Sequence, residues 1–163
     1  MDFTAAYSQL RNSPQFKAWK DAHQNAYLAH FLTQLGLQLE SAAWSIGFYD
    51  PASDRITTFI MNEPIAIIPD EEVFKKENSV SELQLSSVTL TPAQAVAAAH
   101  HVQQQKYPQH PPTKGLAILQ QLDAAVWNIT FITASFAALN IKLNASTGAV
   151  ESDSVSTFFD LQK

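Results

Sequence analysis

The feature that most constrains the fold is a run of short apolar segments in the second half of the chain, each separated from the next by a few residues. Residues 116–122, 126–133, 139–144 and 149–155 are rich in β-branched and aromatic side chains that alternate with polar ones. A period of two is typical of strands with one buried face. Connections this short join antiparallel neighbours, because parallel strands need crossovers of about a dozen residues or more. The pattern therefore predicts an antiparallel meander.

A helix is predicted directly before this meander. Thr91 can accept a backbone N–H of the first turn, and Pro92 stands at the first helical position, where its missing donor is not needed. Small apolar residues then recur on one face until the helix ends near Lys106, which favours close packing on a sheet. The second half is therefore predicted to be α+β, with a helix packed on an antiparallel sheet.

A second helix start, Ser13-Pro14, opens the first half of the chain. We expect this helix to run from residue 14 to about Leu35, with Gly36 as the residue that ends it. Its first part is amphipathic, whereas apolar residues surround the axis from Tyr27 onward. The pattern predicts a long central helix whose second part is buried on several sides.

A β-hairpin and a short third strand are predicted after this helix. Residues 44–48 alternate large apolar with small side chains, residues 50–54 have the composition of a turn, and residues 56–61 suit a returning strand. Residues 65–68 are mostly β-branched and lie between two prolines, which favours a brief strand. Residues 70–76 begin with acidic and end with basic side chains, which favours a short turn of helix.

The two halves resemble each other in their order of elements. The pattern Trp-x-Ile-x-Phe occurs at residues 44–48 and again at residues 127–131. We interpret it as a tandem pseudo-repeat, with halves at about 14–85 and 86–163 that share one core within a single globular domain, residues 1–163. The alternation predicts burial of six residues: Trp44, Ile46, Phe48, Trp127, Ile129 and Phe131.

Two segments of the second half resemble the PepSY family. Residues 90–96, Leu-Thr-Pro-Ala-Gln-Ala-Val, are similar to its helix opening, and residues 140–150, Asn-Ile-Lys-Leu-Asn-Ala-Ser-Thr-Gly-Ala-Val, are similar to its strand and turn, with Asn144 where the family usually has aspartate. The resemblance covers residues 90–155, with a weaker echo in residues 14–68. It implies a cystatin-like fold and a role as a binding module or propeptide inhibitor of peptidases, in a family whose members are mostly exported or membrane-attached.

Composition excludes several classes of function. The chain has no cysteine, which rules out disulfides, thiolate nucleophiles and Cys-based zinc sites. A net charge of −5 without a cluster of basic residues argues against nucleic acid as a partner. The N-terminus lacks a basic stretch followed by an apolar run, and no window approaches the roughly 18 apolar residues of a membrane span. We therefore expect a cytoplasmic protein with no membrane partner.

The sequence contains no recognisable catalytic, cofactor-binding or metal-binding motif, and we expect none of these sites. The candidates for a ligand-binding face are His23, Tyr27 and His30, which share one arc of the predicted helix. Two helical turns separate the histidines by about 10 Å, too far for one metal ion. We predict that both histidines are packed and hydrogen-bonded rather than functional. The histidines at 100, 101 and 110 are predicted to be solvated.

Three functions remain open at this point. The leading hypothesis is a non-enzymatic binding or regulatory module that engages a protein or peptide through a sheet edge, a groove or an exposed aromatic surface. The second is a small-molecule-binding or hydrolytic domain that uses the His23/Tyr27/His30 face. The third is a homo-oligomeric structural protein, such as a homodimer, for which Phe158, Phe159 and Leu161 are candidate contacts. A deep polar pocket against the histidine face would favour the second hypothesis, and a broad apolar patch the others.

Overall fold

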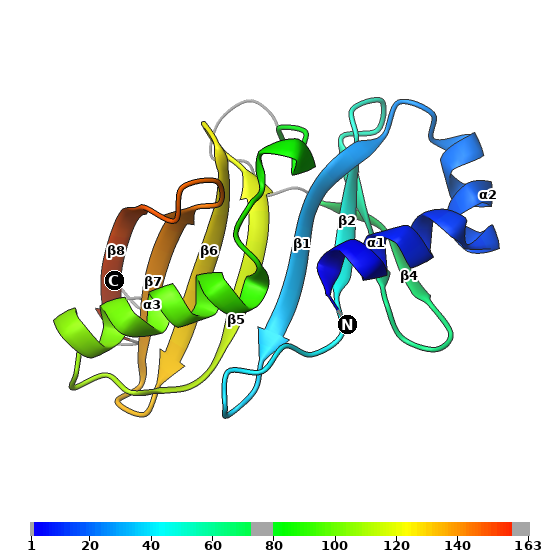
Figure 1. Ribbon diagram of the computed structural model, residues 1–163. Coiled ribbons are helices and arrows are strands. Elements are labelled where there is room, and N and C mark those ends of the chain that lie inside the picture. Colours follow the sequence, from blue (N-terminus) through cyan, green and yellow to red (C-terminus); the bar gives the residue numbers. More distant parts are fainter. Residues whose placement is uncertain (1, 73–79, 158–163) are drawn as a thin grey trace.

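The computed structural model describes residues 2–72 and 80–157 of the protein, and in this part of the chain the fold is α+β. Its strands form an antiparallel eight-stranded sheet in the order β4-β3-β2-β1-β5-β6-β7-β8. Figure 1 shows the arrangement. The elements are α1 (Phe3–Asn12), α2 (Pro14–Ala22), β1 (Tyr27–Leu35), β2 (Ser45–Asp50), β3 (Arg55–Ile60), β4 (Ala66–Glu72), the 3₁₀ turn Leu85–Ser87, α3 (Pro92–Lys106), β5 (Pro112–Gln121), β6 (Ala125–Thr133), β7 (Ala137–Asn144) and β8 (Val150–Thr157).

The predicted helix over residues 14–35 is wrong in its second part. α2 ends at Ala22, and residues 27–35 form β1 at the centre of the sheet. An apolar run cannot be assigned to a buried helix or a buried strand by periodicity alone, and β1 has apolar residues on both faces because it is central. The turn between α2 and β1 is held by Lys20, whose ammonium group donates hydrogen bonds to the carbonyls of Gln24 (2.9 Å) and Ala26 (2.6 Å). Gly36 therefore follows a strand and does not end a helix.

The other predicted elements of the first half are largely confirmed. The hairpin is formed by β2 and β3, and the third strand is β4, which continues to Glu72. The predicted helical turn is therefore wrong for residues 70–72, and residues 73–76 lie outside the described part of the chain. The Ser13-Pro14 helix start is confirmed, since the Ser13 hydroxyl accepts from the backbone N–H of Phe16 at 3.2 Å.

The second half follows the prediction closely. α3 starts with a reciprocal capping box, in which the Gln94 N–H donates to the Thr91 hydroxyl at 3.2 Å and the Thr91 N–H donates to the Gln94 side chain at 2.9 Å. The predicted four-stranded meander is present as β5 to β8. In the turn before β8, Gly148 adopts φ +77°, a conformation that glycine adopts without steric cost.

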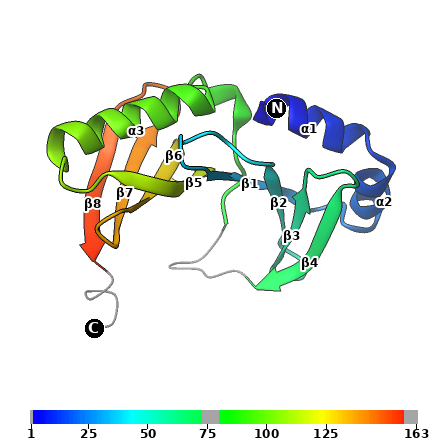
Figure 2. The same ribbon diagram turned by 90° about the horizontal axis from the view of Figure 1, so that it is seen from below.

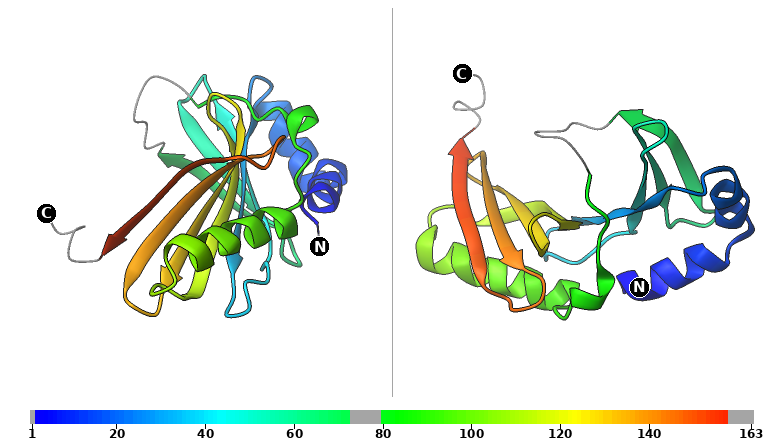
Figure 3. Two further views of the ribbon diagram at one scale, coloured as in Figure 1. Left: turned by 60° about the vertical axis from the view of Figure 1, so that its left-hand side comes forward. Right: turned by 90° about the horizontal axis from the view of Figure 1, so that it is seen from above.

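The helices α1, α2 and α3 pack on one face of the sheet, and the core lies between these helices and that face (Figure 2). The six residues of the repeated pattern are all buried, with exposed fractions of at most 3%. Phe3 of α1 contacts both tryptophans, with ring centroids 6.0 Å from Trp44 and 5.9 Å from Trp127. β1 and β5 pair directly, so the two predicted halves share one twisted sheet and one core (Figure 3).

Candidate functional site

The three residues proposed as a ligand face do not share one helical face. His23 caps the C-terminus of α2, where its ring stacks on Trp19 at 4.7 Å and its Nδ1 lies 2.8 Å from the Trp19 carbonyl oxygen. Tyr27 and His30 lie on β1 instead, and a bulge between residues 28 and 30 brings both to the sheet face that carries no helix. The Tyr27 hydroxyl donates to the Val80 carbonyl at 2.5 Å. His23 therefore has a local packing role, and His30 lines a hollow on the open face of the sheet.

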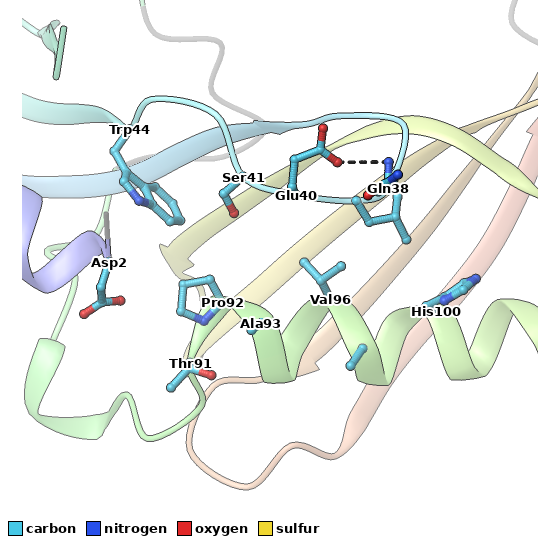
Figure 4. Close-up of a pocket in the computed structure, with 12 residues that line it drawn as sticks. Asp2, Gln38, Glu40, Ser41, Trp44, Thr91, Pro92, Ala93, Val96 and His100 are labelled. Atoms are coloured by element: carbon cyan, nitrogen blue, oxygen red, sulfur yellow. Dashed lines mark hydrogen bonds between the residues drawn. The ribbon is translucent and has the colours of Figure 1, made fainter.

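Two hollows contain candidate binding residues. The larger of these two lies on the helical side of the sheet, where the β1–β2 loop faces the start of α3 (Figure 4). We call it the seam pocket because its walls come from both halves. Its volume is about 680 Å³, within the range of ligand-binding pockets. The lining residues are Asp2, Gln38, Leu39, Glu40, Ser41, Trp44, Thr91, Pro92, Ala93, Val96, Ala97 and His100.

The β1–β2 loop is held in place by its own hydrogen bonds. The Gly36 N–H donates to the Glu40 carbonyl at 2.9 Å, and the Glu40 carboxylate accepts from the Gln38 N–H at 2.9 Å. Leu39, which lines the pocket, has φ 61°, an uncommon conformation for a bulky residue. The surrounding bonds overdetermine this conformation, as is common at binding sites. Hydrogen bonds within the loop therefore hold this wall of the pocket.

The opposite wall is one face of α3. Ala93 and Ala97 are exposed and small, so they leave the space that longer side chains would fill. Val96 is buried beside them, and the half-buried His100 ring packs edge-on against Phe131 at 6.4 Å. The floor is therefore apolar, with one imidazole at its far end.

The charges on the seam pocket are acidic. Asp2 and Glu40 contribute carboxylates, and no lysine or arginine is among the lining residues. Asp2 accepts a hydrogen bond from the Thr4 hydroxyl, and Glu40 is bonded within its own loop. The pocket thus combines an apolar floor with a negatively charged rim.

The second hollow lies on the open face of the sheet, and we call it the His30 pocket. Its volume is about 370 Å³, and it is lined by His30, Leu32, Ser45, Ile56, Thr58, Ile60, Ile68, Glu71 and Glu72. The Thr58 hydroxyl donates to the Glu71 carboxylate at 2.8 Å. Burial lowers the pKa of His30, and the nearby Glu71 carboxylate partly opposes that shift.

The described ranges contain neither a group of three or more histidine and acidic side chains placed to hold a metal ion nor a helix long and apolar enough to cross a membrane. Of the other histidines, His101 is exposed, and His110 lies 2.6 Å from the Ser135 hydroxyl. Phe158, Phe159 and Leu161, the candidate self-association contacts, lie outside the described residues.

Sequence reasoning missed the seam pocket. The alternation over residues 44–48 predicts that Trp44 lies in the core, which the structure confirms. The small residues of α3 predict only close packing on the sheet. Ala93 and Ala97 were the available signal, because the buried contacts of α3 are made by the neighbouring Ala95 and Ala99.

Comparison with known proteins supports the fold and goes no further. No family model matches the chain, and no curated protein matches it. Among solved structures, the fold is similar to that of a protein from Clostridium difficile 630 described as a "putative lipoprotein". The two share 17% identical residues with a TM-score of 0.53, over 87% of this chain and 90% of that one. At this identity the similarity concerns the fold alone.

Proposed function

We propose that the protein is a non-enzymatic binding module that takes up an apolar side chain of a protein or peptide partner in the seam pocket. The observation that carries this proposal is the preformed apolar floor between the β1–β2 loop and α3. Peptide-binding domains gain specificity from such pockets, and a wall that is ordered in advance reduces the entropy lost on binding.

The acidic rim suggests the chemistry of the partner. With carboxylates at Asp2 and Glu40 and no lysine or arginine among the described lining residues, a basic side chain next to the apolar anchor would be attracted. The partner segment is therefore proposed to combine a leucine- or phenylalanine-like residue with lysine or arginine. A PepSY-like origin belongs to the same proposal, supported by the helix α3 on the meander β5 to β8. The cytoplasmic location expected from the sequence stays a prediction.

The sheet edges support peptide addition less well than the seam pocket does. β4 carries Pro69, which has no N–H to donate, and the acidic Glu71 and Glu72. On the other edge, Asp153 of β8 is engaged by Lys106 at 2.8 Å and by the Tyr107 hydroxyl at 2.6 Å. Charged residues of this kind are typical of edges that avoid pairing with another strand. The groove is therefore the favoured surface.

The test measures binding of short labelled peptides by fluorescence polarisation. The panel places a central leucine between two lysines, between two glutamates, and replaces the leucine by serine in the lysine background. We expect the Lys-Leu-Lys peptide to bind at least tenfold more tightly than either of the others. Equal binding of all three peptides, or none, would contradict the proposal.

A helix substitution identifies the site. Ala97→Leu keeps a strong helix former and fills the pocket, so it should weaken peptide binding at least tenfold. The matched control is Gln105→Leu, on an exposed position of α3 outside the lining, which should leave binding unchanged. Peptide binding that survives Ala97→Leu would place the binding site elsewhere.

A further inference from the structure

The His30 pocket is distinct from the proposed peptide site, because it lies on the opposite face of the sheet. Its walls are apolar and come from three strands, β1, β3 and β4, through Leu32, Ile56, Ile60 and Ile68. Among the polar lining residues, the Thr58 hydroxyl donates to the Glu71 carboxylate, and this carboxylate is close enough to affect His30 electrostatically; Ser45 and Glu72 complete the polar part of the lining. A concave apolar site with a few convergent polar groups is the general form of a small-ligand site.

The backbone beneath His30 is shaped to hold the imidazole. Gly47 is the strand partner of His30, and a Cβ at Gly47 would lie 2.2 Å from His30 Cε1. Only a glycine therefore lets the ring lie flat on β2 in this position. A glycine inside a strand weakens it and often marks the close approach of another group. Within the described ranges no hydrogen bond is made by the His30 ring, so its nitrogens remain available to a ligand.

The charge of the pocket is set by one carboxylate. Glu72 forms an ion pair with Arg55 at 3.3 Å, whereas Glu71 receives only the neutral Thr58 hydroxyl among the described residues. Among residues 2–72 and 80–157, no lysine or arginine belongs to the lining. The low pKa of His30 keeps its ring uncharged near neutral pH, so the imidazole does not compensate Glu71 either. A carboxylate that has no cationic partner within the described part of the chain, next to apolar walls, attracts a cation with an apolar body.

We propose that the His30 pocket binds a small organic cation of the alkylammonium class, with its apolar chain along the isoleucine walls and its ammonium group on Glu71. A neutral imidazole nitrogen of His30 accepts a second N–H of the ammonium group. The volume of about 370 Å³ suits a ligand of modest size. This site and its ligand go beyond the peptide-binding function and do not depend on it.

The probe is hexylammonium chloride, titrated into the full chain at pH 8 and followed by the NMR signals of the His30 imidazole. The comparison ligands 1-hexanol and hexanoate carry the same chain with no charge or the opposite charge. We expect hexylammonium to bind at least tenfold more tightly than either and to shift the His30 signals. Equal binding of 1-hexanol, or binding that leaves the His30 signals unmoved, would overturn the proposal.

Matched variants then test the residues. Glu71→Gln should weaken hexylammonium binding about tenfold, whereas Glu72→Gln, on the same strand but paired with Arg55, should change it less than twofold. An unchanged affinity for Glu71→Gln in a protein with wild-type near-ultraviolet circular dichroism would overturn the assignment. Ala97→Leu, which fills the seam pocket, should leave hexylammonium binding intact. Loss of binding in that variant would show that the cation sits in the seam pocket instead.

Discussion

The strand registers on the two sides of the β1–β5 junction follow the same pattern, whereas the open faces of the two sides differ where the His30 pocket lies. When the two copies of the Trp-x-Ile-x-Phe pattern are aligned, Ser45 of β2 corresponds to Asn128 of β6. Ser45 pairs with Leu32 and Asn128 pairs with Ile118, and these two partners pair with each other across the β1–β5 junction. The strand registers are therefore those of an approximate twofold axis through the Leu32–Ile118 pair. A common origin of the halves stays a prediction.

The same registers show what each half places on its open face. His30 pairs with Gly47 in the first half, and the corresponding pair in the second half is Leu116 and Thr130. The counterpart of Thr58, the next residue across the sheet, is Asn140. An imidazole over a glycine therefore has no equivalent in the other half.

The second half fills this face with polar contacts of its own. The Asn140 amide donates to the Asn128 side-chain oxygen at 2.6 Å and to the Thr130 hydroxyl at 2.9 Å. These side chains satisfy one another, whereas the first half leaves a hollow with His30 at its end. The fold can thus be built without a histidine or a glycine at these positions. The histidine and the glycine of the first half are the residues on which the proposed cation site depends.

The strongest test of the correspondence removes one tryptophan from each half. Trp44 and Trp127 are both essentially buried and contact the same ring of α1, Phe3. Trp44→Ala and Trp127→Ala should each lower the free energy of unfolding by about 3–5 kcal/mol, measured by urea denaturation. If one substitution cost less than half as much as the other, the two positions would not be energetically equivalent.

The next test concerns the pair that the second half lacks. Gly47→Ala should cost about 1–3 kcal/mol because the new methyl group meets the His30 ring. In the double variant Gly47→Ala/His30→Ala the clash is absent, so its cost should be smaller than the sum of the two single costs. Urea denaturation of all four proteins gives the coupling energy. Strict additivity would mean that the ring does not lie against β2.

Strand patterns made the second half predictable, whereas in the first half an overlooked turn between α2 and β1 led to the wrong assignment of residues 27–35. The Thr91-Pro92 helix start and the alternation over β5 to β8 are local sequence signals, and the structure has the predicted helix and strands at these positions. In contrast, β1 carries apolar side chains on both faces, and the bulge between Leu28 and His30 interrupts the alternation by which a strand is recognised. Gln24 and Asn25 are the local sign that the helix ends. Neither pocket could be predicted, because each is assembled from strands and loops far apart in the chain.

A smaller effect is expected from the polar network of the second half. Asn140→Ala removes two hydrogen bonds. Asn128 and Thr130 are already half-exposed in the wild type, so water can replace the lost partner. The free energy of unfolding should fall by about 1 kcal/mol. The control Asn12→Ala lies at the exposed end of α1. An effect of Asn140→Ala no larger than that of the control would mean that the network does not stabilise this face.

The smallest expected effect is a pH dependence that belongs to the first half alone. Burial lowers the pKa of His30 in the folded protein, so the unfolded chain binds a proton at a higher pH than the folded chain does. Within the described part of the chain, the charged groups of the pocket are Glu71 and Glu72 of β4, of which Glu72 is paired with Arg55 of β3, and the partner of His30 on β5 is the uncharged Gln120.

The sign of this dependence follows directly. Stability from the neutral His30 ring is fully present above the ordinary histidine pKa of about 6.5 and is lost as the pH falls from there through the lower folded pKa. His30→Leu removes the titrating group. It also gives the first half a leucine at the position that corresponds to Leu116 in the second half. Urea denaturation between pH 7.5 and about 5 should therefore show a smaller loss of stability for His30→Leu than for the wild type. The exposed His101→Leu serves as control and should keep the wild-type slope. Parallel pH profiles for His30→Leu and the wild type would show that the buried imidazole is not the source of the difference between the halves.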